Sequence, residues 1–210
     1  AEALSDHNHP GARPLEPLSR YSDWQVPWPI QWPNREQRLQ WVRDRLVGIT
    51  TFAVDGSQIF PSKDVAPPIA LVQIGWFENP HLPIGTYDKD VRLTVMTPSE
   101  LQVMRNGRSL DRQVGMRRFE MEVERLIEFI EEHPGRSDCL VFLDGSLVGT
   151  FAEAFDADCR AFYAQQFKNL LRASEEYRVP LVGYIDTSHA CDLVQMLYCL
   201  ESVPETTTLH

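Results

Sequence analysis

The sequence predicts an α/β protein in which helices flank a mixed central sheet. Three consecutive strand-like segments occupy residues 48–61, 67–80 and 86–97, which indicates an antiparallel meander. Helical and strand-like segments alternate after them, as in sheets whose later strands are joined by crossover helices. The order of elements is therefore β-β-β-α-β-α-β-α.

The first part of the chain differs in composition from the rest. Residues 1–33 contain six prolines and three tryptophans. Prolines at this density block both helices and strand pairing, so we expect an arm that packs through its aromatic side chains. Residues 34–47 have apolar positions at helical spacing. We therefore expect an N-terminal arm and helix over residues 1–47 and the α/β domain over 48–210.

The later elements follow from apolar periodicity and from the residues that break it. A long amphipathic helix is predicted over 111–132 and a buried strand over 139–147. A helix over 151–177, a strand over 179–186 and a short helix over 189–200 complete the domain. A meander followed by strand–helix alternation is the order expected of an RNase H-like fold.

Composition narrows the class of protein. The chain has 210 residues, of which 43% are hydrophobic, so a sizeable core is expected. Its longest apolar runs are strand-sized, too short for a membrane helix, and we expect a cytoplasmic protein. The four cysteines form no CxxC pair and are expected to be buried thiols. The net charge of −10 argues against a protein that coats DNA, but not against one that binds it locally.

Two similar strand ends carry the clearest chemical signal. In FAVDGSQ (52–58) and VFLDGSL (141–147), apolar residues run directly into Asp55 and Asp144, and each aspartate is followed by Gly-Ser. We expect a turn after each aspartate, with both carboxylates at the rim of the sheet. There they can share a divalent cation, because Mg²⁺ and Mn²⁺ prefer oxygen ligands. The alternative is that each Asp-Gly pair is only a turn.

Further carboxylates could complete such a site. On a helical wheel Glu120 lies nearest the apolar stripe of the long helix, with Glu124 and Glu122 as rivals. The alternative is that all three belong to a solvated face. Asp186 ends the last strand and is either a fourth metal ligand or the cap of the following helix.

One stretch of the chain is rich in arginine and is a candidate phosphate-binding surface. The alternative is a solvated loop and helix start. Its members are Arg105, Arg108, Arg112, Arg117 and Arg118.

Four segments together resemble the NurA nucleases, in particular bacterial members: FAVDGSQIF, RRFEMEVERL, VFLDGSL and LVGYIDTSHACDLV. The resemblance covers about residues 48–200. It implies an RNase H-like fold and a Mn²⁺-dependent DNA nuclease that degrades DNA from 5′ ends and cuts single strands. It also implies a homodimer that works in DNA end resection, docked on a HerA-type hexameric ATPase.

The resemblance also assigns residues. Asp55 and Asp144 match the family's metal-binding aspartates, and its catalytic glutamate falls at Glu120, with Glu122 and Glu124 as rivals. Together they would hold two Mn²⁺ or Mg²⁺ ions.

Two features depart from the family. Many members carry a lysine in the segment where this chain has Asp186. The family's last motif, with an acidic or tyrosine position and a histidine, is not found here. We therefore expect a nuclease domain that is incomplete at its C-terminal end.

Other functions stay open at this point. A non-catalytic RNase H-like module that binds a HerA-type ATPase would show no metal binding. A metal-dependent phosphatase would act on small phosphate esters without DNA. A glycosidase that uses the carboxylate pair would need no metal.

Overall fold

The computed structural model of the chain describes residues 29–62, 64, 66–103, 110–149, 152 and 155–187. Asn34–Asp186 form one compact unit, which contains all the helices and strands given below. The short helix expected at 189–200 and most of the expected N-terminal arm lie outside the described residues.

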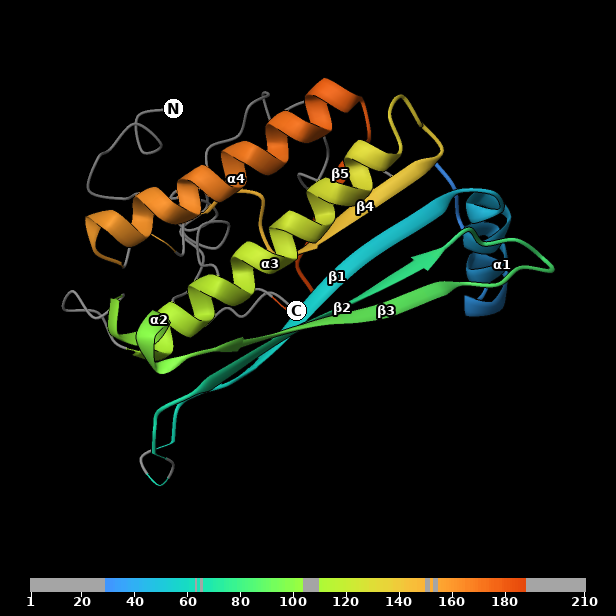
Figure 1. Cartoon of the computed structure of the whole chain (residues 1–210). Helices are drawn as coiled ribbons and strands as arrows, with labels where there is room; N and C mark the ends of the chain where they lie inside the picture. Colours follow the sequence, from blue (N-terminus) through green and yellow to red (C-terminus); the bar gives the residue numbers. More distant parts are fainter. Residues whose placement is uncertain are drawn as a thin grey trace, which may run out of the picture. The chain divides into compact units, whose positions relative to one another are not determined.

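The unit contains a single five-stranded sheet in the order β3-β2-β1-β4-β5 (Figure 1). β1, β2 and β3 form the antiparallel meander, whereas β4 is parallel to β1 and β5 is parallel to β4. This topology is RNase H-like, and the predicted fold is confirmed. The elements are α1 (Arg35–Leu46), β1 (Thr50–Ile59), β2 (Ala70–Asn79), β3 (Asp88–Met96), α2 (Pro98–Val103), α3 (Leu110–Glu132), β4 (Cys139–Asp144), α4 (Ala157–Tyr177) and β5 (Leu181–Tyr184).

Two helices differ from the expectation. The helix predicted to begin at residue 151 begins at Ala157, because the Asp156 side chain caps it by accepting a hydrogen bond of 2.9 Å from the Cys159 backbone N–H. α2 was not predicted, since six residues are too few to show a helical period. None of the described helices is long and apolar enough to cross a membrane.

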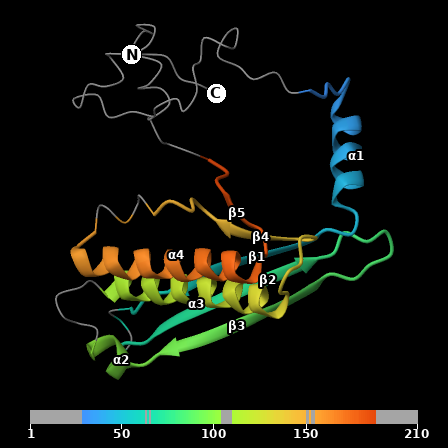
Figure 2. The same cartoon turned by 90° about the horizontal axis from the view of Figure 1, so that it is seen from above.

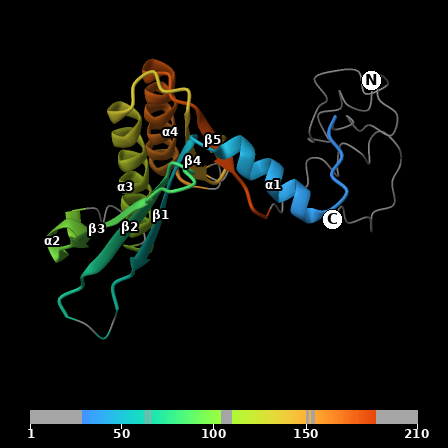
Figure 3. The same ribbon diagram turned by 90° about the vertical axis from the view of Figure 1, so that its right-hand side faces the viewer.

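The core lies between the sheet and a helical layer. α3 and α4 lie side by side on one face of the sheet (Figures 2 and 3). Alternate strand residues face them and are buried, such as Phe52 on β1 and Val141 on β4. Phe52 stacks on Phe129 of α3 with 3.9 Å between ring centroids. Cys139 and Cys159 are buried free thiols, as predicted.

The opposite face of the sheet is exposed, and we call it the open face. Val91 and Leu93 of β3 are 59% and 52% exposed there, although both are apolar. Because side chains alternate along a strand, the positions between the buried ones all belong to it. Around the centre of the sheet the open face consists of Ala53, Asp55, Gly75, Phe77, Lys89, Val91, Leu93, Phe142, Asp144, Val182 and Tyr184.

Candidate active site

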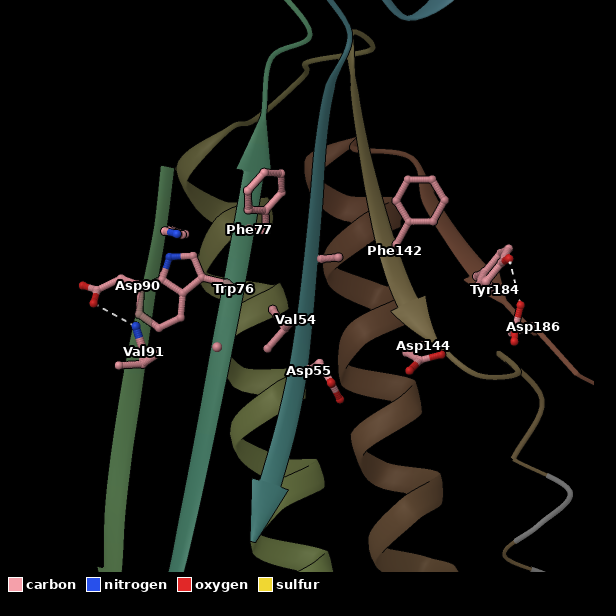
Figure 4. A pocket seen from close by; sticks show the side chains of 13 residues that line it. Val54, Asp55, Trp76, Phe77, Asp90, Val91, Phe142, Asp144, Tyr184 and Asp186 are labelled. Atoms are coloured by element: carbon pink, nitrogen blue, oxygen red, sulfur yellow. Dashed lines mark hydrogen bonds between the residues drawn. The ribbon is translucent and has the colours of Figure 1, made fainter. Parts of the chain in front are cut away.

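A cavity on the open face brings acidic side chains together with aromatic ones. Asp55, Asp144 and Asp186 line it, beside Phe77 and Phe142 (Figure 4). In the close-up the two aspartates of β1 and β4 lie next to each other at the end of β4. The cavity thus includes the aspartates of both Asp-Gly-Ser segments that the sequence singled out.

Strand register explains why Asp55 and Asp144 meet. Val54 pairs with Leu143 in the parallel β1–β4 ladder, so the next residue along each strand is an aspartate. Neighbouring strands lie about 4.8 Å apart, and both carboxylates point to the same face. The two aspartates are therefore held side by side by backbone pairing.

The prediction of a turn after Asp55 is wrong. β1 continues to Ile59, and it pairs with β2 along its whole length, so Asp55 lies in the middle of a strand. Only the second Asp-Gly-Ser ends its strand, at Asp144, where Gly145 has a φ of +131°. Because β4 stops there and β1 does not, the edge of β1 beyond Asp55 has no strand beside it on the β4 side among the described residues.

Glu122 is the glutamate that α3 places against this part of β1. Its side chain is 13% exposed, compared with 32% for Glu120 and 47% for Glu124. Glu120 instead pairs with Arg117 at 2.7 Å along the helix. The structure therefore places Glu122, and not Glu120, against the strand that carries Asp55.

The helical wheel pointed to Glu120 because it counted only apolar residues. Phe119 contacts Tyr163 of α4, so that side of the apolar stripe faces α4 and not the sheet. The side that faces the sheet mixes Phe129 with charged residues, such as Arg125, whose guanidinium lies 4.9 Å from the Phe52 ring centroid. An apolar pattern cannot reveal a sheet-facing side that is partly charged.

Gly56 lets α3 approach the strand closely. Arg118 donates a hydrogen bond of 3.2 Å from Nη1 to the Gly56 carbonyl, and its Nε lies 3.5 Å from Glu122 Oε1. The Gly56 N–H donates to Asp55 Oδ1 at 2.8 Å. Gly56 therefore joins the β1 aspartate to the α3 glutamate.

The electrostatics of this cluster are dominated by burial. Burial raises the pKa of the Glu122 carboxyl to about 7, and Arg118 opposes this rise. The charges of Asp55 and Asp144 also raise the pKa, whereas a hydrogen bond from Gly56 lowers it. The three carboxylates therefore interact, and Glu122 changes protonation near neutral pH.

We expect Gly56→Ala to destabilise the protein by about 1–3 kcal/mol, because an added Cβ overpacks this contact. That Cβ would lie 2.7 Å from Arg118 Cγ and closer still to Glu122 Oε1. The change is measured by urea unfolding. Gly115→Ala on α3 is the control, since its Cβ would meet nothing within 4 Å, and it should stabilise the helix by about 0.5–1 kcal/mol. Equal stability of Gly56→Ala and the wild type would contradict the close approach.

Asp186 lies at the rim of the same cavity. It follows β5, is exposed, and accepts a hydrogen bond of 3.4 Å from the Tyr184 hydroxyl. The residues after Thr187 lie outside the described part of the chain, so whether Asp186 caps a helix stays a prediction.

The arginines that the structure describes have different partners. Arg112 pairs with Asp156 at 2.9 Å, and Arg117 pairs with Glu120. Arg118 lies under β1 beside Glu122. Arg105 and Arg108 lie outside the described residues.

The donor set fits a hard divalent cation. Asp55, Glu122 and Asp144 offer only carboxylate oxygens, which Mg²⁺ and Mn²⁺ prefer. Burial is the main cause of the raised pKa of Glu122, and the charges of Asp55 and Asp144 add to it, so a cation would relieve this repulsion. Within residues 29–187, as far as they are described, no three acidic, cysteine or histidine side chains already surround one point.

Comparisons with known proteins give one family and a few distant structures. A NurA domain model matches residues 49–209. The NurA nuclease from Sulfolobus solfataricus is similar with a TM-score of 0.42 and 11% identity, covering 76% of this chain and 59% of that one. The protease–reverse transcriptase of prototype foamy virus is similar with a TM-score of 0.31 and 12% identity, covering 71% and 19%. No curated protein matches the sequence.

Proposed function

Because the chain belongs to the NurA family, we propose that it is a metal-dependent nuclease that hydrolyses the phosphodiester bonds of DNA. One observation carries the proposal: Asp55 and Asp144 lie side by side on the open face, and the buried Glu122 lies against Gly56 on the helix side of β1, close enough for the two aspartates to raise its pKa. Such a group of carboxylates beside an open cavity suits cation-assisted attack on a phosphate.

Each residue has a distinct role in this hypothesis. Asp55 and Asp144 would hold one or two Mn²⁺ or Mg²⁺ ions, and their strands keep the carboxylates in place. Bound ions would lower the pKa of a water molecule and neutralise charge on the scissile phosphate. Glu122 would complete the ligand set, and a carboxyl whose pKa is about 7 can accept a proton at neutral pH. Asp186 would contribute a further oxygen from the rim.

The finer properties rest on the family resemblance. We propose 5′–3′ exonuclease and single-strand endonuclease activity in DNA end resection, in the cytoplasm. We also propose a homodimer that docks on a HerA-type hexameric ATPase. Arginines before and within α3 are candidates for phosphate contacts away from the site: Arg105, Arg108, Arg112 and Arg117.

The decisive experiment combines Mn²⁺ titration by calorimetry with cleavage of a 5′-labelled single-stranded oligonucleotide. We expect Mn²⁺ binding, and cleavage that stops when a chelator is added. A small phosphate ester serves as a second substrate. Hydrolysis of the ester without cleavage of DNA would favour a phosphatase, and absence of Mn²⁺ binding would favour a non-catalytic module.

A further inference from the structure

This inference rests on the proposed function and concerns the substrate. We propose that the open face binds unpaired bases of a single-stranded nucleic acid by stacking them on Phe77 and Phe142, beside the carboxylates. The nuclease site and the stacking surface would then be neighbouring parts of one cavity.

Strand register places the aromatic side chains in one row across the sheet. Phe77 pairs with Ala53, and Ala53 pairs with Phe142, so two phenylalanines flank one alanine on the open face. Lys89 and Val182 extend this row to the two outer strands. We call these five residues the aromatic row.

The next row on the same face carries the carboxylates. Gly75 pairs with Asp55, and Asp144 follows in register and pairs with Tyr184. Side chains two positions apart on a strand are separated by about 6.8 Å. This is about the length of one extended nucleotide, so a base on the aromatic row leaves its phosphate within reach of the carboxylates. Figure 4 shows Phe77 and Phe142 at one level and the two aspartates at the next.

The surface between the rings suits a flat apolar group. Phe77 is 42% exposed, and Tyr87 packs against it with 5.0 Å between ring centroids, which supports its ring. Ala53 and Gly75 have little or no side chain, so the floor between the aromatic residues is low. Nucleobases stack on such platforms whatever their sequence.

The apolar floor of the cavity, and not its charge, favours a single strand over a duplex. A duplex presents its phosphates outward and hides its base faces, so it is bound mainly by clustered cations. The described lining of this cavity has one basic side chain, Lys89, and two acidic ones beyond the central pair, Asp90 and Asp186. An apolar floor with few cations is suited to exposed bases.

The test is binding of a fluorescent oligothymidylate to the full chain, measured by anisotropy in a chelator so that no metal-dependent cleavage occurs. We expect Phe77→Leu and Phe142→Leu each to raise the Kd about tenfold, since both keep apolar volume but lose the aromatic face. Phe142→Tyr should bind as the wild type does. A blunt duplex of equal length should bind more weakly, and the leucine variants should not change its affinity.

Phe60→Leu is the matched control. Phe60 is 41% exposed, almost the same as Phe77, but it does not line the cavity. We expect the Kd of the Phe60→Leu variant for the oligothymidylate to differ from that of the wild type by less than about twofold. Thermal unfolding of each variant shows whether the sheet is intact.

The outcomes separate this inference from the nuclease proposal. Metal-dependent cleavage by the wild type, with unchanged binding in both leucine variants, would overturn the stacking surface and leave the nuclease. Aromatic-dependent binding without any cleavage would support the surface and remove the nuclease. If the leucine variants lose affinity for the duplex and the single strand equally, the single-strand assignment is overturned. Self-association that Phe77→Leu abolishes, without oligonucleotide binding, would show that a second copy covers the face.

Discussion

Asp55→Asn and Asp144→Asn should each lower the rate of DNA cleavage by about 10³-fold or more, because each removes a charged ligand from the proposed metal site. The amide has nearly the same shape as the carboxylate, and both side chains lie on the exposed face of the sheet. We therefore expect the free energy of unfolding to change by less than about 0.5 kcal/mol. Cleavage is measured on a single-stranded oligonucleotide at saturating Mn²⁺.

Asp90→Asn is the matched control for these variants. Asp90 lines the same cavity from β3, so the substitution removes the same charge near the site without touching the aspartate pair. Its rate should stay within about threefold of wild type, the change expected from a distant charge in water. Full activity in Asp55→Asn would end the assignment of this residue as a metal ligand.

Glu122→Gln should stabilise the metal-free protein at pH 8 while abolishing cleavage. The pKa of Glu122 is about 7 in the folded protein and 4.5 when unperturbed. The folded state therefore holds a proton that the unfolded state releases, so the free energy of unfolding falls as pH rises from about 4.5 to about 7. The loss is at most about 3 kcal/mol. Glutamine cannot ionise, so the Glu122→Gln variant does not lose this stability as the pH rises.

The measurement is urea unfolding in a chelator at pH 8 and near pH 4.5. We expect the free energy of unfolding of Glu122→Gln to exceed that of the wild type by about 2–3 kcal/mol at pH 8. Near pH 4.5 the difference should be less than about 0.5 kcal/mol, because Glu122 is then neutral in the folded state and about half ionised in the unfolded state. Glu120→Gln is the control, because Glu120 is partly exposed and paired with Arg117. It should change stability by less than about 1 kcal/mol at either pH. If the two variants behave alike, Glu122 is not the buried member of the cluster.

The strands and the long helix could be predicted because local pattern and tertiary burial agree. Alternation in β1 and β3 and the apolar run of β4 correspond to one buried face per strand. The start of α4 was missed because the capping contact of Asp156 outweighs the apolar residues before it. Capping is a local hydrogen bond that an apolar period does not detect.

The two aspartates could be found from the sequence, but the reason for their meeting could not. Each follows an apolar strand, and the repeated Asp-Gly-Ser marks both. The chain continues as a strand at Gly56, where a turn was expected, because β2 pairs with β1 beyond the point where β4 stops. Gly56 lets α3 approach β1 closely and does not form a turn.

Sequence alone determined the order of the strands and long helices, the mixed sheet and the positions of Asp55 and Asp144, since these depend on residue patterns within a few positions of one another. Tertiary structure decided that Glu122 and not Glu120 lies against β1, and that Arg118 lies beside it. It also aligned Phe77 and Phe142 in one row through the register of three strands. The physical reason is that rotation of a helix over a sheet, and pairing between strands, depend on contacts between segments far apart in the chain.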